Sequence, residues 1–392
     1  MTDFNRELIC DLAAIREQGL YRELRRVDSP QSSRIEVEGK TFLNFSSNDY
    51  LGLANHPVLK QAAIDAVGRF GAGSGGSRLI CGSLSPHHEL EEALAAFKGA
   101  EAALSFSSGY AAAIGAIGAL LGKEDTIIID KLVHACIVDA ARLSGAKLRV
   151  FAHNDLDDLE DILKWADKKA QNAERATRIR QPRVLIATES VFSMDGDHAP
   201  LRNIVELKER YGAWLMVDEA HATGLYGASR RGLAEEFGVS DRIEVQMGTL
   251  GKALGAAGGY ICGSRPLIEC LLNRARSFIF STAPTPATVA AASAAIQLLK
   301  SSEGETRRAR LWQHVAELNP ELRSAIIPVM IGPETKSLEA AAKLRKLGIF
   351  VPAIRYPTVA RGAARLRVTV TAAHMADDIA TLKSTLGQIV DC

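Results

Sequence analysis

Short apolar runs rich in β-branched residues alternate with longer helical patterns through most of this chain. From Asn55 to about residue 247, helices and strands are predicted in turn. Because parallel neighbouring strands need a long crossover, usually a helix, this alternation indicates an α/β fold with a mostly parallel, helix-covered sheet. The expected helices are 57–70, 87–98, 109–121 and 201–211, and the expected strands are 126–130, 147–151, 183–188, 213–217 and 242–247.

A second, smaller α/β pattern follows Pro284 and Pro286. It comprises a helix at 287–300, a strand at 324–331, a helix at 336–347, strands at 349–354 and 365–371, and a closing helix at 375–390. At the other end, Leu8, Leu12 and Ile15 predict an amphipathic helix that packs as an arm on the main domain. A length of 392 residues corresponds to ~2.6 average domains. We predict an N-terminal segment (1–50), a large domain (51–288) and a small C-terminal α/β domain (289–392).

Charge and composition exclude several classes of protein. Forty-seven Lys+Arg against 46 Asp+Glu leave no global field for a polyanion, so we expect no nucleic-acid partner. Two charge-free stretches, 102–122 and 277–299, are long enough to cross a bilayer, but glycines, hydroxyls and prolines favour buried helices, so no membrane contact is expected. Residues 1–26 mix acidic and basic side chains and have no apolar core, which argues against a secretory signal or a transit peptide, so we expect a cytoplasmic protein. The six cysteines and nine histidines lack metal-ligand spacing, so we expect no metal.

Two glycine-rich segments are candidates for binding phosphate. Gly71–Gly76 has the spelling G-x-G-x-x-G, but a helical pattern precedes it and none follows, which is the wrong context for a dinucleotide site. Ser107–Tyr110 lies between the apolar run 102–106 and the start of a helix, where free N–H groups and the helix dipole favour an anion. The alternative for this second segment is a simple serine N-cap.

Reactive side chains follow three consecutive apolar strands, where an open parallel sheet places its ligand site. They are Glu189 to Ser193 after the first strand, Asp218 and His221 after the second, and Lys252, in a glycine-flanked turn, after the third. This combination suits a pyridoxal phosphate (PLP) enzyme: the lysine forms a Schiff base, the aspartate pairs with the pyridinium nitrogen, and a helix N-terminus takes the phosphate. The alternative interpretations are that Asp218 is a turn residue at the end of a strand and that Lys252 is an ordinary surface lysine.

Four longer motifs resemble the signatures of the α-oxoamine synthases. They are Ser46–Leu53, Thr188–Asp197, Asp218–Gly224 and Gly248–Gly255. These fold-type I PLP enzymes join an amino acid to an acyl-CoA with loss of CO2, and the resemblance covers about residues 20–390. It implies an aspartate aminotransferase-like fold, with a large mostly parallel sheet domain and a small C-terminal α/β domain, and an acyltransferase activity.

Within that family, the Asn48 motif and Ala364–His374 most resemble the biotin-pathway member. The resemblance implies that L-alanine is condensed with a pimeloyl thioester carried by CoA or by acyl carrier protein. Glycine C-acetyltransferase is the alternative, since Gly248–Gly255 and Arg78–Gly82 resemble that enzyme too. A non-catalytic binding protein with the PLP fold is a remote alternative.

The resemblance assigns roles to residues around the cofactor. Lys252 carries PLP as a Schiff base and then acts as the base at Cα, Asp218 faces the ring nitrogen, His221 contacts the ring oxygen, and His134 stacks on the ring and helps to orient the substrate. From the sequence pattern by itself, His134 would be interpreted as a buried core histidine with satisfied hydrogen bonds. The further cofactor contacts that the resemblance implies are Ser108, Gly109, Tyr110, Ser193 and Thr249, together with Ser281 and Thr282, which reach the phosphate of a neighbouring subunit in a homodimer.

The resemblance also implies a set of substrate contacts. Besides His134, it comprises Arg22, Asn48, Thr358 and Arg367. Arg367 is the preferred partner of the amino-acid carboxylate, because a guanidinium binds that anion with two parallel hydrogen bonds. Arg365, two residues earlier on the same strand face, is its rival, and Arg25 competes with Arg22. The charged stretch 166–182 has no assigned role, and an exposed helix is expected there.

Overall fold

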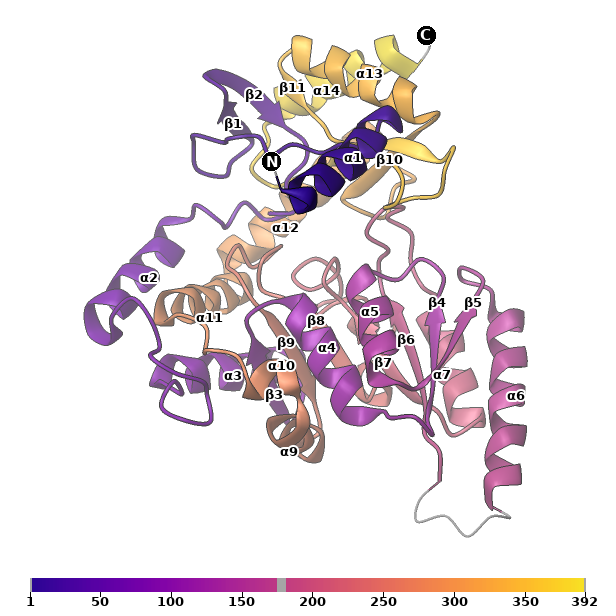
Figure 1. Ribbon diagram of the computed structural model, residues 1–392. Coiled ribbons are helices and arrows are strands. Elements are labelled where there is room, and N and C mark those ends of the chain that lie inside the picture. Colours follow the sequence, from indigo (N-terminus) through magenta and orange to yellow (C-terminus); the bar gives the residue numbers. More distant parts are fainter. Residues whose placement is uncertain (1, 175–180, 391–392) are drawn as a thin grey trace. The chain divides into compact units, whose positions relative to one another are not determined.

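The computed structural model describes residues 2–174 and 181–390 (Figure 1). Its contacts form two compact units. One contains residues 51–193 and 197–310, and the other contains residues 1–50, 194–196 and 311–392. We call them the large unit and the small unit. The domain limits predicted from the sequence, after residues 50 and 288, stay a proposal about folding units.

A seven-stranded sheet forms the centre of the large unit. In spatial order its strands are β3 (Ala102–Phe106), β9 (Gly259–Gly263), β8 (Val245–Thr249), β7 (Trp214–Asp218), β6 (Val184–Glu189), β4 (Thr126–Asp130) and β5 (Lys147–Phe151). Only β9 runs antiparallel to its neighbours, which confirms the predicted mostly parallel sheet. Strand β8, predicted at 242–247, begins later than expected, because residues 240–242 form a 3-10 turn.

Helices precede, connect and follow these strands along the chain (Figure 1). They are α2 (Pro57–Phe70), α3 (Ser85–Lys98), α4 (Gly109–Leu120), α5 (Ala135–Ser144), α6 (Leu156–Glu174), α7 (Leu201–Arg210), α8 (Leu233–Glu236), α9 (Arg265–Arg274), α10 (Arg276–Ile279) and α11 (Pro286–Lys300). The charge-free helix α4 is buried along most of its length, as expected. A Cβ on its Gly115 would lie 2.6 Å from Ser277 Oγ, so the close helix packing requires glycine there.

No helix in the described ranges has both the length and the apolar character needed to span a bilayer. Helix α6 extends into the charged stretch 166–182, and residues 175–180 of that stretch lie outside the described residues.

The small unit contains two three-stranded sheets. One is formed by β1 (Arg34–Val37), β2 (Lys40–Asn44) and β11 (Ile349–Phe350), and the other by β10 (Ile326–Gly332), β13 (Ala364–Thr369) and β12 (Ala353–Ile354). Its helices are α1 (Asp3–Glu17), α13 (Glu334–Lys346) and α14 (Ala376–Val390), and α12 (Ser302–Leu318) crosses the residue limit between the units. The single strand predicted at 349–354 is wrong: it is two short strands in different sheets, separated at Pro352, which lacks a backbone donor.

Helix α1 forms where the apolar periodicity predicts it, but its packing differs from the expectation. All of its residues are exposed. The exposed fraction is 45% for Leu8 and 40% for Ile15. The periodicity therefore predicted the helix correctly, whereas its apolar stripe is not buried within the described part of the chain.

Candidate active site

The carboxyl ends of β6, β7 and β8 lie side by side in the large unit. Glu189 pairs in register with Asp218, and Asp218 pairs with Met247. The strand ends therefore bring three loops together, which begin after Glu189, Asp218 and Thr249. This is the arrangement that the sequence predicted for the reactive side chains.

Asp218 is the last residue of β7, and its carboxyl is buried. Its Oδ1 accepts a hydrogen bond from the Ala220 N–H at 2.9 Å, which holds the side chain at the turn after the strand. Burial raises the pKa of Asp218, and the nearby Lys252 amine opposes that rise. A buried carboxylate of this kind binds a cationic partner strongly, because little water screens the interaction.

Lys252 and His221 are in direct contact. The Lys252 Nζ lies 2.7 Å from the His221 Nε2. An ammonium group can only donate, so in that state Lys252 donates to Nε2 and the proton of a neutral His221 is on Nδ1. The loop carrying Lys252 is held by a hydrogen bond from the Gly255 N–H to the Lys252 carbonyl at 2.9 Å. Gly255 has a φ of +61°, which favours glycine there.

His134 caps the N-terminus of α5. Its Nδ1 accepts a hydrogen bond from the Cys136 N–H at 3.2 Å, so the proton of the neutral ring is on Nε2. Burial lowers the pKa of His134 and favours this neutral form, while the charge of Asp218 opposes the shift. His134 can therefore cap the helix and also act as a site residue, because the cap uses only one of its ring nitrogens.

The N-terminus of α4 adjoins the end of β8. Ser108 is the N-cap, and its Oγ accepts a hydrogen bond from the Ala111 N–H at 3.0 Å, as the N-cap alternative predicted. A Cβ on Gly109 would lie 3.8 Å from the Thr249 Cβ, and a Cβ on Gly259 would lie 2.5 Å from the Gly109 nitrogen. The backbone is therefore packed closely around first-turn N–H groups that have no partner within the helix.

The other residues predicted to contact the cofactor differ in their surroundings. Tyr110 is partly exposed, and its hydroxyl donates a short hydrogen bond to the Asp139 carboxylate. Ser193 is buried in the loop after β6. Ser281 is half-buried, and the exposed Thr282 pairs with Ser77 in an isolated bridge next to the Gly71–Gly76 segment. That segment thus contacts neighbouring backbone, and it follows helix α2 instead of a strand.

Glu189 is a buried acidic group that the sequence placed among the reactive side chains at the strand ends, but to which we assigned no contact with cofactor or substrate. It is 2% exposed, and its Oε1 has no hydrogen-bond partner within the described residues. Burial raises the pKa of Glu189 to about 8, and the Asp218 charge adds to the rise, against the opposing effects of Lys252 and the His134 backbone. At neutral pH this carboxyl is therefore largely protonated.

A Glu189→Gln variant is expected to flatten the pH dependence of the cofactor-free protein's stability. The folded pKa is above the unfolded value, so the unfolded state binds fewer protons between pH ~4.5 and ~8 and stability falls there by about 1 kcal/mol per pH unit. The neutral amide removes that slope. Denaturant unfolding from pH 5 to 8 measures it, with the exposed Glu269→Gln as the matched control. An unchanged slope in Glu189→Gln would contradict the assignment.

Lys98 and Glu219 form a buried ion pair that sequence reasoning also missed. The Lys98 ammonium donates to the Glu219 carboxylate and to the Arg231 carbonyl, while Glu219 accepts from the Ala234 N–H at 2.8 Å. Because Glu219 directly follows Asp218, this pair anchors the end of β7. A lysine in the last turn of a helix gives no sequence signal that distinguishes it from an exposed one.

Apart from His134, the residues that were predicted to contact substrate lie in the small unit. Arg367 is buried on β13 and donates to the Asn48 Oδ1 at 3.1 Å and to the Thr369 Oγ1 at 2.9 Å. Arg365, also buried, forms a short ion pair with the Asp195 carboxylate. The two rivals therefore differ in their surroundings, because Arg365 pairs with a carboxylate whereas Arg367 donates to an amide oxygen and a hydroxyl.

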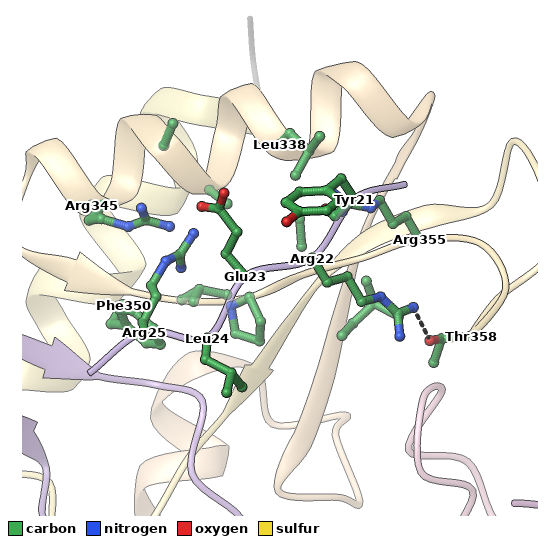
Figure 2. A pocket seen from close by; sticks show the side chains of 16 residues that line it. Tyr21, Arg22, Glu23, Leu24, Arg25, Leu338, Arg345, Phe350, Arg355 and Thr358 are labelled. Atoms are coloured by element: carbon green, nitrogen blue, oxygen red, sulfur yellow. Dashed lines mark hydrogen bonds between the residues drawn. The ribbon is translucent and has the colours of Figure 1, made fainter. Parts of the chain in front are cut away.

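Arg22 and Arg25 both line a pocket of about 820 Å³ in the small unit (Figure 2). The Arg22 Nη2 donates to the Thr358 Oγ1 at 3.5 Å, which brings together two of the predicted substrate contacts. Arg25 lies toward the other end of the pocket, next to Phe350 (Figure 2).

Known proteins resemble the chain over nearly its whole length. A family model described as aminotransferase class I and II matches residues 40–386. The 8-amino-7-oxononanoate synthase of Geobacter sulfurreducens is 46% identical over 98% of both chains. That of Thermoanaerobacter pseudethanolicus is 46% identical over 95% of this chain and 94% of the relative.

Solved structures are similar as well. Serine palmitoyltransferase from S. paucimobilis, with a bound PLP–myriocin aldimine, superposes with a TM-score of 0.89 at 28% identity, over 100% of both chains. For 8-amino-7-oxononanoate synthase from Francisella tularensis the TM-score is 0.72 at 28% identity, over 89% of this chain and 97% of that one.

Proposed function

The chain belongs to the aminotransferase class I and II family and, within it, to the 8-amino-7-oxononanoate synthases, and from this we propose that it catalyses the PLP-dependent condensation of L-alanine with a pimeloyl thioester. The products are 8-amino-7-oxononanoate, CO2 and the free carrier thiol, in biotin biosynthesis. The observation that carries the proposal is that Lys252 contacts His221 and lies near the buried Asp218 at adjacent strand ends, in a chain that resembles 8-amino-7-oxononanoate synthases.

The residues of the large unit fit PLP. Asp218 offers a buried carboxylate for a cationic ring nitrogen, Lys252 offers the amine, and the first turn of α4, with no side chain at Gly109, offers N–H groups to a phosphate. Ser108, Tyr110, Ser193 and Thr249 complete the set of proposed contacts within the chain. When bound, PLP supplies an electron sink for the carbanion that forms at the Cα of the amino acid.

Lys252 moves the proton in this mechanism. Its amine takes the proton from Cα and later returns one to the product, which is general acid–base catalysis by a positioned side chain. His221 orients the amine through the 2.7 Å contact, and it would bind the ring oxygen of PLP. Asp218 would keep the ring nitrogen protonated, and the neutral His134 would stack on the ring and offer its Nε2–H to the substrate.

Arg367 is the proposed partner of the alanine carboxylate, with Asn48, Arg22 and Thr358 as further substrate contacts. Because Lys cannot make two parallel hydrogen bonds, an Arg367→Lys variant is expected to raise KM for alanine roughly 10- to 100-fold, with a smaller change in kcat. Steady-state kinetics at saturating thioester measure this.

The rival residue provides the control for that prediction. Arg365→Lys weakens the ion pair with Asp195, so we expect a lower melting temperature and a nearly unchanged KM for alanine. If Arg365→Lys raised KM and Arg367→Lys did not, Arg365 would be the residue that binds the alanine carboxylate.

Assembly and location belong to the same proposal. The protein acts as a homodimer in which Ser281 and Thr282 contact the phosphate bound by the neighbouring subunit, and the exposed Thr282 is compatible with that contact. The balanced charge supports a small-molecule substrate without a nucleic-acid partner. Substrates that are activated intracellular thioesters point to the cytoplasm.

The function is tested by measuring release of the carrier thiol while alanine, glycine and serine are each paired with acetyl, pimeloyl and palmitoyl thioesters. Alanine with a pimeloyl thioester is expected to be the preferred pair, and mass spectrometry of the product identifies 8-amino-7-oxononanoate. A preference for glycine with acetyl-CoA would instead establish a glycine C-acetyltransferase.

A further inference from the structure

The 820 Å³ pocket of the small unit is strongly basic (Figure 2). It is lined by the segment 21–25, by α13, by the strands β11 and β12 with the turn between them, and by Thr358. Its charged lining residues are Arg22, Arg25, Arg345, Arg355 and Glu23, so four positive charges and one negative charge leave a net charge of +3. Such a cavity favours an anionic ligand.

Two of the four arginines are held within the pocket by neutral oxygens. Arg22 donates to the Thr358 hydroxyl, and Arg355 donates to the Tyr21 carbonyl at 2.8 Å. Within the described residues, Arg25 and Arg345 form neither a hydrogen bond nor an ion pair. Their guanidinium groups are therefore available for a ligand.

Arg25 and Arg345 converge on one aromatic ring. The guanidinium carbon of each lies 5.8 Å from the centroid of Phe350, and Figure 2 shows both side chains pointing into the same end of the pocket. Burial and the charge of Arg25 lower the pKa of Arg345, with Glu38 opposing the shift. The two cations thus repel each other, and an anion bound beside both would relieve that repulsion.

Helix geometry explains only part of this arrangement. Lys343, Arg345 and Lys346 lie in the last turn of α13, where the helix dipole favours cations. That effect accounts for a positive charge on this turn, but it does not account for a second arginine, from the segment 21–25, at the same aromatic ring.

We propose that Arg25 and Arg345 bind the phosphate of the phosphopantetheine arm that carries the pimeloyl thioester. This inference rests on the proposed function. A phosphate accepts two parallel hydrogen bonds from a guanidinium group, and every carrier of the thioester, CoA or acyl carrier protein, has one on this arm. The opposite end, with Arg22 and Thr358, remains with the substrate contacts proposed above.

The test compares thioesters with and without the phosphate. Pimeloyl-CoA, pimeloyl-acyl carrier protein and pimeloyl-pantetheine are assayed with alanine and the holoenzyme for the wild type, Arg25→Gln, Arg345→Gln and the double variant. We expect kcat/KM to fall roughly 10- to 100-fold on the phosphate-bearing thioesters and less than about twofold on pimeloyl-pantetheine. The carrier with the larger loss is the one whose phosphate uses the site.

Lys343→Gln is the matched control, because it removes an exposed cation from the same helical turn outside the pocket lining. It should leave the ratio between pimeloyl-CoA and pimeloyl-pantetheine unchanged. Heptanoyl-CoA lacks the far carboxylate of the pimeloyl chain and separates that group from the phosphate. If the loss in Arg25→Gln and Arg345→Gln disappears with heptanoyl-CoA, or is equal with and without phosphate, the inference is wrong.

Calorimetry separates this inference from the proposed function, since it needs no turnover. Binding of CoA to the holoenzyme should weaken roughly 10-fold or more in Arg25→Gln, whereas any binding of pantetheine should not change. If the wild type turns over no pimeloyl thioester with alanine, the proposed function fails, and the calorimetric comparison still decides whether Arg25 and Arg345 bind the phosphate.

Discussion

A Lys252→Ala variant is expected to lose turnover by on the order of 10⁴-fold or more while keeping its fold. The side chain has two tasks, covalent attachment of PLP and proton transfer at Cα, and its Nζ lies in direct contact with His221. Removing it leaves the site without its base and without the bond that holds the cofactor.

Colour and mass provide readouts that do not depend on turnover. With PLP, the wild type is expected to be yellow and to gain the mass of the reduced cofactor after borohydride treatment, whereas Lys252→Ala should gain none. Lys131→Ala is the matched control, because Lys131 is exposed and follows strand β4 of the same sheet. A borohydride adduct that persists in Lys252→Ala would show that another lysine carries the cofactor.

An Asp218→Asn variant is expected to lower kcat by on the order of 10³-fold. A carboxylate facing a cationic ring nitrogen contributes about 4 kcal/mol at an effective dielectric of 20, and the amide removes that charge while it can still accept from the Ala220 N–H. The ring nitrogen then loses its proton more readily and the ring becomes a weaker electron sink.

The stability of Asp218→Asn should not fall with its kcat. Burial raises the pKa of Asp218 in the cofactor-free protein, so the carboxyl's contribution is complete below the unfolded pKa and is lost as pH rises toward the folded pKa. Asp218→Asn should therefore make the cofactor-free protein at least as stable at pH 7 by denaturant unfolding. Asp241→Asn, at an exposed position, is the control. Unchanged kcat in Asp218→Asn would contradict the proposed contact with the ring nitrogen.

Periodic elements could be predicted from the sequence, and irregular ones could not. The strands 126–130 and 147–151 and the helix 57–70 have the predicted limits, because each has a clear apolar pattern between turn residues. Strand β9 escaped notice because glycines at both ends and a five-residue length resemble a loop. The region 349–354 reads as one apolar run, and only pairing with different partners shows that it is two strands.

The candidate site divides in the same way. Reactive side chains after apolar strands gave the positions of Asp218, His221 and Lys252, since parallel strands align their carboxyl ends. Sequence could not distinguish Arg365 from Arg367, because both lie on one face of one strand and only the tertiary contact with Asp195 separates them. Nor could it identify Glu189 as a protonated acid, since a pKa depends on burial and neighbouring charges.

Sequence by itself determined the fold class, the family resemblance and the chemistry of the three strand ends, because these depend on local periodicity and on motifs continuous in the chain. The tertiary structure decided which side chains meet: the contact of Lys252 with His221, the pairing of Arg365 with Asp195, and the approach of Arg25 and Arg345 to the ring of Phe350. Such meetings join residues far apart in the chain, and the free energy of each depends on burial and charge that exist only once the chain is folded.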